Sequence, residues 1–264
     1  MSKVSVIQGD QRRKAVYESL YGLGMEFVDR IKATKSILVV PNISSADSAF
    51  AIHADALRGT IDAIRVHSRA PISIGAAGMY GTKAVFQRLG YDRLLREYDH
   101  LRCVDFYDDS LIESFIDDGA MMIRRPATAM SRSFVISIAP IIPSRTEYIS
   151  FCIENWIRNS WIVPPRSSAT GMVWNHEPWL EGKRDRVIGE LYHQKPCDLA
   201  IIDGIETRSI VLAGFDPVAV DTVGASLTGI DVASDSYLSL LSERGHGECA
   251  LSKIDVPLGI VSPR

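Results

Sequence analysis

The chain has 264 residues, 46% of them hydrophobic, which is enough to bury the core of one large α/β domain. Its 29 Lys+Arg and 32 Asp+Glu residues give a formal net charge of −3, which argues against nucleic acid or an anionic membrane as a partner of the whole molecule. No linker-like stretch divides the sequence, so residues 1–264 are expected to form a single domain.

The N-terminal residues combine charges with no long apolar segment. A signal peptide and a membrane helix are therefore not expected, and the sequence predicts a cytoplasmic protein.

Helices and β-rich runs alternate along the first half of the chain. Apolar residues at helical spacing predict a helix over 11–33, and two further helices are expected over 47–67 and 82–89. The expected strands are 37–40, 71–76, 101–106 and 134–139. This alternation predicts an α/β fold with a mostly parallel sheet and helices on both faces.

Three glycines lie between the strand 71–76 and the helix 82–89. Backbone N–H groups of Gly78 and Gly81 at a helix N-terminus could hold a phosphate, with Lys83 as its cation. The same glycines also suit a tight turn that needs positive φ. Their spacing matches neither a Walker loop nor the dinucleotide fingerprint.

All four tryptophans fall within residues 156–179, together with the pair Pro164-Pro165 and several charged residues. This composition predicts a lid over the sheet edge or a subunit contact, and core packing is the alternative. The surrounding residues 121–195 contain 10 Lys+Arg and 6 Asp+Glu. This basic region could face an anionic ligand or could be ordinary solvated surface.

Near the C-terminus, a helix over 181–193 precedes an apolar strand, 199–202, that ends on Asp203. The next apolar run, 210–213, is expected to be its neighbour and leads to Asp216. Open α/β sheets bind ligands at the carboxyl ends of their strands, which makes both acids site candidates. Each also has an ordinary interpretation, since Asp203 could end a strand and Asp216 could cap the helix that begins at Pro217.

Asp221 lies within an otherwise apolar helical stretch. A carboxylate there is costly unless it is paired, hydrogen-bonded or bound to a cation, so we expect it to be buried and partnered. Asp216 and Asp221 are about 140° apart around a helix, and a metal held by both is not expected. If Asp203 and Asp221 converged, this would favour a ligand site over structural roles.

The cysteines are spread along the chain without any CxxC pair, at Cys103, Cys152, Cys197 and Cys249. This spacing predicts no disulfide framework and no iron–sulfur cluster held by this chain alone. The identity of any other cofactor stays open.

Several motifs resemble one known family. They are DLAIIDG at 198–204, FDPVAVD at 215–221, RTEYISFCIENWI at 145–157, and Pro41-Asn42 after the first predicted strand. Together they resemble the uncharacterised family called domain of unknown function 362, over about residues 36–262. Some members of that family carry iron–sulfur ferredoxin segments, which this chain lacks.

The resemblance implies several site residues and several departures. The family pattern has a lysine before Pro-Asn, where this chain has Val40 followed by Pro41 and Asn42, and a Lys-Asn pair where this chain has Glu154 and Asn155. A Lys-x-His element is replaced here by a segment containing Arg145. The resemblance also suggests a histidine near the site, which would be His176.

Two functions follow from these observations. The first is an enzyme, or a ligand- or metal-binding protein, that acts on a small anionic ligand at the carboxyl edge of the sheet. Its expected catalytic residues are Asp203, Asp221, Asp216, Asn155 and Glu154, and its expected ligand-binding residues are Asn42, Gly78, Gly81, Lys83, Arg145 and His176. The second is a non-catalytic accessory or assembly protein that kept the fold and dimerises through the Trp-rich segment 156–179.

Overall fold

The structure is a computed structural model, and it describes residues 1–43, 51–78, 81–116, 121–141, 150–162, 166–168, 171–173, 184–232 and 236–256. Seven strands form its central sheet: β2 (Ser5–Gln8), β3 (Ile37–Pro41), β4 (Ile72–Ala76), β5 (Leu101–Asp105), β8 (Phe134–Pro140), β11 (Leu199–Gly204) and β12 (Ile210–Gly214). Their order across the sheet is β2-β12-β11-β8-β3-β4-β5.

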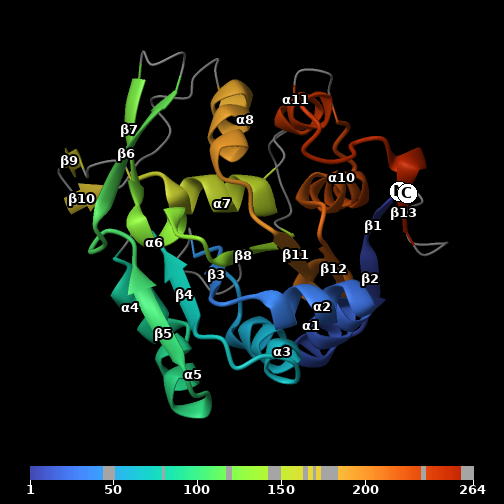
Figure 1. The fold of residues 1–264 in the computed structure, drawn as a ribbon, viewed down its shortest axis with the longest axis horizontal. Helices are drawn as coiled ribbons and strands as arrows, with labels where there is room; N and C mark the ends of the chain where they lie inside the picture. Colours follow the sequence, from blue (N-terminus) through green and yellow to red (C-terminus); the bar gives the residue numbers. More distant parts are fainter. Residues whose placement is uncertain are drawn as a thin grey trace.

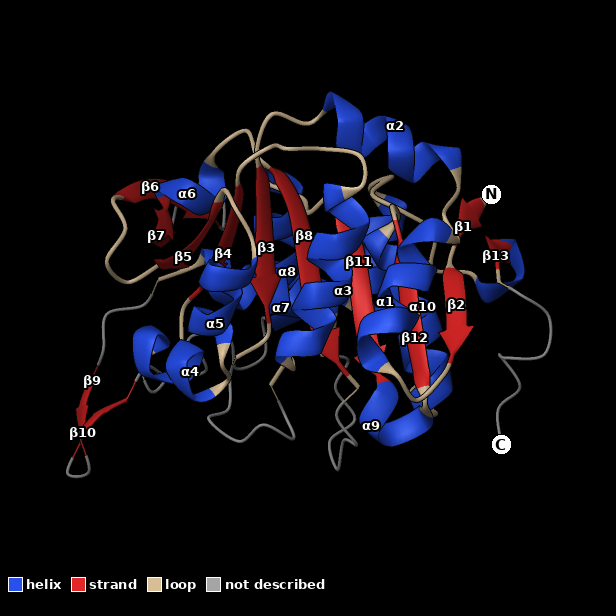
Figure 2. Cartoon of the chain, turned by 90° about the horizontal axis from the view of Figure 1, so that it is seen from below, coloured by secondary structure: helices blue, strands red, loops and turns tan. Residues whose placement is uncertain are grey.

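One strand of this sheet runs against the others. β11, β8, β3, β4 and β5 are parallel to one another, whereas β12 is antiparallel to both β11 and β2. β2 therefore points the same way as β11, and the carboxyl ends of all strands except β12 meet at one edge of the sheet (Figure 2). We call this the carboxyl edge.

Helices cover both faces of the sheet (Figure 1). The first, which we call the α1 face, packs against α1 (Arg12–Tyr21), α2 (Met25–Ala33), α3 (Ala54–Arg65), α4 (Thr82–Arg88) and α5 (Tyr91–Glu97). The second, the α7 face, packs against α7 (Cys152–Ser160), α8 (Arg184–Gln194), α10 (Pro217–Thr228) and α11 (Tyr237–Glu243). The inner strands β3, β8, β11 and β12 contribute alternate side chains to two separate cores, which explains why their sequences are apolar almost throughout.

The remaining elements lie around this sandwich. A short parallel pair joins β1 (Ser2–Lys3) to β13 (Ile254–Asp255), and two hairpins are formed by β6 (Leu111–Ile116) with β7 (Met121–Pro126) and by β9 (Arg166–Ser168) with β10 (Gly171–Val173). Short helical turns are α6 (Ala127–Met130), α9 (Ile205–Arg208) and a 3-10 turn over Leu251–Lys253.

The chain reverses its winding direction between two neighbouring strands. β3 continues through α3 on the α1 face to β4, whereas β8 continues through α7 and α8 on the α7 face to β11. The connections after β3 and β8 thus leave the carboxyl edge toward opposite faces. Such a switch point is where open α/β sheets commonly form a ligand crevice.

The predicted α/β architecture, a mostly parallel sheet with helices on both faces, is confirmed. The helix expected over 11–33 is divided into α1 and α2 because Gly24 adopts a φ of 73°, a conformation that ordinary side chains disfavour. The helix expected from residue 47 begins only at Ala54 in the described residues. None of the helices in the described part of the chain combines the length and apolar character needed to cross a bilayer.

Candidate functional site at the carboxyl edge

Asn155 ties together the two strands of the switch point. From α7, its Nδ2 donates to the carbonyl of Val40 in β3 and to Ser137 Oγ in β8, both at 2.9 Å, and lies 3.3 Å from the carbonyl of Ile138. The backbone N–H of Asn42 also donates to Ile138, at 2.8 Å. The structure thus brings Asn42 and Asn155 together at the carbonyl of Ile138.

Asn159 extends this network by one helical turn. Its Nδ2 donates to Asn155 Oδ1 at 3.0 Å, and its Oδ1 accepts from the N–H of Ala77, which follows β4, at 2.8 Å. Both asparagines are buried. Asn159 was not predicted from the sequence, although its spacing of four residues from Asn155 on a helix was a usable signal. The two side chains satisfy backbone groups of three strands, which gives them an architectural role.

Glu154 is buried beside two arginines. Its carboxylate oxygens lie 2.8 Å from Arg158 Nη2 and 2.6 Å from Arg184 Nη2. Burial raises the pKa of Glu154, but the charges of Arg158 and Arg184 outweigh burial and leave the pKa below its ordinary value. Glu154 is therefore ionised, and its ion pair with Arg184 holds the first residue of α8 against α7.

Asp221 is fully buried and partnered, as predicted. Its two carboxylate oxygens accept from the N–H groups of Cys152 at 3.0 Å and Ile153 at 2.9 Å, and Tyr237 Oη lies 3.4 Å away. Those N–H groups are the unpaired donors at the first turn of α7, whose own N-cap residue, Phe151, supplies no side-chain acceptor. Asp221, which lies in α10, thus caps the N-terminus of α7. Burial raises its pKa to about 7, despite these hydrogen bonds.

Asp203 faces the other side of the sheet. One of its oxygens lies 2.8 Å from Arg12 Nε in α1, and the other accepts from the N–H of Ile205. Burial raises the pKa of Asp203 above its ordinary value, although the charge of Arg12 opposes that rise. Since Asp203 contacts α1 and Asp221 contacts α7, the two acids lie on opposite faces and do not converge.

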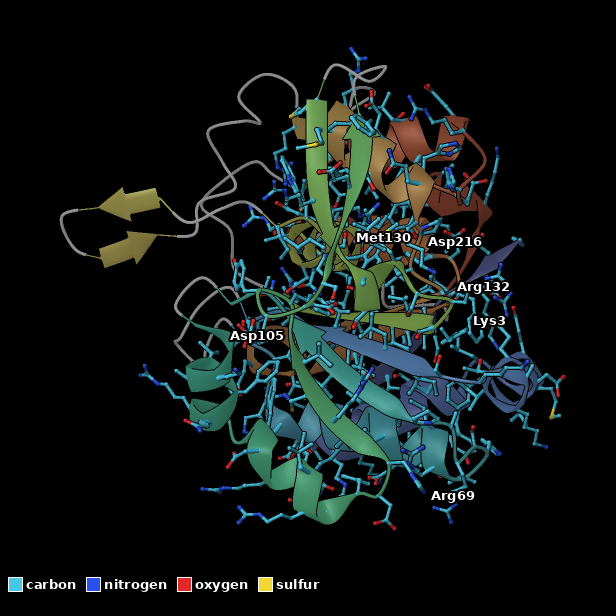
Figure 3. The ribbon with its side chains drawn as sticks, turned by 60° about the vertical axis from the view of Figure 1, so that its left-hand side comes forward. Lys3, Arg69, Asp105, Met130, Arg132 and Asp216 are labelled. Carbon is cyan, nitrogen blue, oxygen red and sulfur yellow. The ribbon has the colours of Figure 1, made fainter. Side chains whose placement is uncertain are left out.

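Asp216 lies at the opposite edge from the other candidates. The expectation that it follows a strand at the carboxyl edge is wrong, because β12 is antiparallel to β11. In Figure 3, Asp216 appears beside Lys3 and far from Asp105, which ends β5 at the carboxyl edge. Its carboxylate accepts from Ala219 N at 3.0 Å, so the alternative interpretation as a helix cap is confirmed.

The glycine turn after β4 is closed by a neighbouring side chain. The N–H of Gly78 donates to Thr82 Oγ1 at 2.9 Å, and Gly81 has a φ of 91°. Lys83 is exposed and pairs with Asp108 at 2.5 Å. These contacts match the tight-turn alternative. Arg145 and His176 lie outside the described residues.

Two of the four tryptophans belong to the core of the α7 face. Trp156 is fully buried and its Nε1 donates to the carbonyl of Lys195 at 2.6 Å, and Trp161 is buried as well. The core alternative is therefore correct for these two. Trp174 and Trp179 lie outside the described residues.

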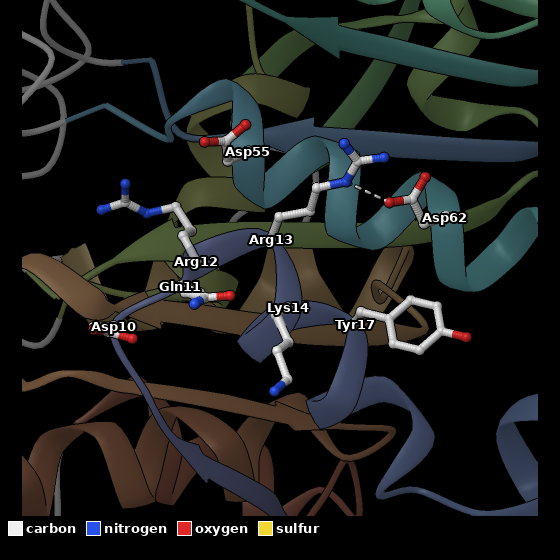
Figure 4. A pocket seen from close by; sticks show the side chains of 8 residues that line it. All are labelled: Asp10, Gln11, Arg12, Arg13, Lys14, Tyr17, Asp55 and Asp62. Carbon is white, nitrogen blue, oxygen red and sulfur yellow. Dashed lines mark hydrogen bonds and ion pairs between the residues drawn. The ribbon is translucent and has the colours of Figure 1, made fainter.

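A pocket of about 750 Å³ opens at the start of α1 (Figure 4). It is lined by Asp10, Gln11, Arg12, Arg13, Lys14, Tyr17, Asp55 and Asp62. Because β2 points the same way as β11, this pocket lies at the carboxyl edge, and Arg12 connects it to Asp203. This pocket was not predicted, although the sequence shows Arg-Arg-Lys at 12–14, shortly after the β-rich run 5–8.

The pocket combines three basic and three acidic side chains. Arg13 Nε lies 2.6 Å from Asp62, and Asp55 lies 2.8 Å from Arg58 Nη1, so these two acids already have cationic partners. The first turn of α1 contains no acidic residue, and Gln11, its N-cap residue, makes no capping hydrogen bond through its side chain. Across the described residues, no three His, Cys, Asp or Glu side chains are grouped so that they could hold a metal ion.

A family model matches most of this chain. No curated protein is similar enough to this chain to be matched. Residues 37–226 match the family described as domain of unknown function (DUF362), a span that includes β3, the switch point, Asn155, Asp203 and Asp221. Because this match covers most of the chain, the protein belongs to the DUF362 family.

Proposed function

We propose that this protein binds a small anionic ligand, one that carries a phosphate or carboxylate group, in the pocket at the start of α1. The observation that carries the proposal is a pocket of about 750 Å³ at the carboxyl edge, onto which the uncapped first turn of a ten-residue helix opens. Unpaired N–H groups and the helix dipole favour a negative charge at such a position.

Arg12 is the side chain best placed to bind the anion. Its guanidinium is held on one side by the buried Asp203, whereas its Nη2 donates at 2.8 Å to Glu206, whose side chain is 70% exposed. An exposed carboxylate contributes little to stability. A ligand anion could therefore replace Glu206 at Arg12 while Asp203 keeps the guanidinium in position.

Under this proposal Asp203 is a positioning residue that acts through Arg12. Asp55 and Asp10 in the same pocket suit hydroxyl or amino groups of the ligand, since carboxylates accept hydrogen bonds from such groups. Asn155, Glu154 and Asp221 support the fold on the other face of the sheet. The proposal covers binding and assigns no reaction.

Calorimetric titration with pyrophosphate, inorganic phosphate and citrate tests the proposal. Lys14→Gln should weaken binding of the tightest anion about twofold to fivefold, since exposed charges are worth up to about 1 kcal/mol. Glu206→Gln should strengthen binding because it removes the competing carboxylate.

Lys83→Gln is the matched control, because Lys83 is an exposed lysine on α4 and contributes nothing to the pocket. It should leave affinity unchanged. The proposal fails if none of the three anions binds, or if Lys14→Gln and Lys83→Gln have the same effect.

A further inference from the structure

Among the described residues, exposed large hydrophobic side chains are most frequent on the hairpin formed by β6 and β7. Among the described residues, ten large hydrophobic side chains are exposed, and four of these are on the hairpin β6–β7: Leu111, Ile112, Phe115 and Met122. The hairpin is a two-stranded sheet of its own, and it projects away from the central sheet (Figure 1). By the strand register, Leu111, Phe115 and Met122 lie on one side of the hairpin and Ile112 lies on the other. Exposed apolar side chains that share one side commonly mark sites of protein interaction.

The register of the hairpin places these side chains in a defined pattern. Phe115 pairs with Met122, and Glu113 pairs with Arg124 two residues further along. Because side chains alternate along a strand, these four residues share one side of the hairpin, opposite to Arg125. Phe115 is 56% exposed and Met122 is 48% exposed, whereas Arg125 is fully buried. We call the side formed by Glu113, Phe115, Met122 and Arg124 the hairpin face.

Arg125 fixes the orientation of this face. Its Nε donates to the carbonyl of Ser160 at 3.1 Å, its Nη2 donates to Ser160 Oγ at 2.9 Å, and its Nη1 lies 3.4 Å from the carbonyl of Leu191. These acceptors are near the C-terminal ends of α7 and α8, where the helix dipole favours a cation. Gln194 Nε2 adds a hydrogen bond to the carbonyl of Phe115 at 2.7 Å.

We propose that the hairpin face binds the same face of a second copy of this chain. A twofold axis parallel to the strands would place β6 of one protomer against β7 of the other. Phe115 would then face Met122 of the partner subunit, and Glu113 would face Arg124 of the partner subunit. Among the described residues of its own chain, neither Glu113 nor Arg124 forms an ion pair, and this arrangement would place opposite charges against each other across the interface.

The structure favours a dimer in which two hairpin faces pack together over one in which the strands of two hairpins pair edge to edge. The outer edge of β6 is occupied at Phe115, whose carbonyl accepts from Gln194, and the outer edge of β7 is occupied at Arg124, which forms a bridge with Ile162. A single short hairpin offers an area at the small end of known interfaces. We therefore expect a dimer whose population rises with protein concentration.

Sedimentation velocity over a wide concentration range tests this proposal. The wild-type protein should approach twice the 29.1 kDa mass of one chain as concentration rises. Phe115→Lys should weaken the dimer at least tenfold, because it places a charge at the centre of the apolar contact. Glu113→Arg and Arg124→Glu should each weaken it, and the double variant should restore it because the swapped charges are again complementary.

Val66→Lys is the matched control, since Val66 is an exposed hydrophobic residue at the end of α3 on another part of the surface. It should leave the dimer unchanged. Circular dichroism would confirm that each variant is folded. A wild-type protein that stays monomeric at every concentration, or a dimer equally tight in Phe115→Lys and Val66→Lys, would overturn the proposal.

Discussion

Two helices that each follow a strand ending at the carboxyl edge differ at their N-termini. α7, which follows β8, receives the carboxylate of Asp221 on its first two N–H groups. α1, which follows β2, has no side-chain cap from Gln11, and its first turn faces a pocket. The donors of α7 are therefore used within the fold, whereas the first turn of α1 receives no cap from the side chain of its N-cap residue and faces the pocket. The proposed binding of an anion at α1 depends on this difference between the two helix ends.

The largest effect should come from removing the cap of α7. Asp221→Ala leaves two buried N–H groups without an acceptor, and each unsatisfied buried donor costs about 1–3 kcal/mol. We expect the free energy of unfolding, measured by denaturant melts, to fall by about 4 kcal/mol.

Asp216→Ala is the comparison for that variant, because Asp216 also caps a helix but accepts partly exposed hydrogen bonds at the opposite edge. Its loss should cost about 0.5–2 kcal/mol. Equal losses of unfolding free energy in the two variants would show that burial does not make the Asp221 cap more stabilising than the Asp216 cap.

A change of pH should alter the free energy of unfolding by less than the removal of the Asp221 side chain does. The pKa of Asp221 is about 7 in the folded state, against about 3.9 for an unfolded aspartate. The folded state thus keeps this proton to higher pH, so the stability contribution is complete below about pH 4 and is lost as pH rises through about 7. We expect wild-type protein to lose about 1–3 kcal/mol over this window relative to Asp221→Asn. Parallel pH profiles for the two proteins would contradict this assignment.

Most of the fold could be predicted from the sequence because the strands are buried on both sides. Apolar runs such as 37–40 and 199–202 correspond closely to β3 and β11, and Asp216 with Pro217 marked the start of α10 correctly. The hairpin β6–β7 was missed because its exposed hydrophobic residues do not show the simple alternation of a half-buried strand.

The site was harder to predict because it depends on strand direction and on contacts between distant segments. An apolar run indicates a strand but not its direction, so Asp216 was placed at the wrong edge. The backbone donors to Asp221 are 68 and 69 residues away in the sequence, and the cationic partner of Asp203 is Arg12 on α1, so no local pattern could show that the two acids lie on opposite faces.

Titration of pyrophosphate into the wild-type protein and Gln11→Ser tests the central claim most directly. Serine at this N-cap position would accept a hydrogen bond from the first turn of α1, as Asp221 does for α7, without changing the charge. The account predicts that the wild-type protein binds pyrophosphate, and that Gln11→Ser is about 0.5–1 kcal/mol more stable but binds about threefold more weakly. If the wild-type protein does not bind this anion, or if the added cap leaves affinity unchanged, the uncapped turn of α1 is not the binding site.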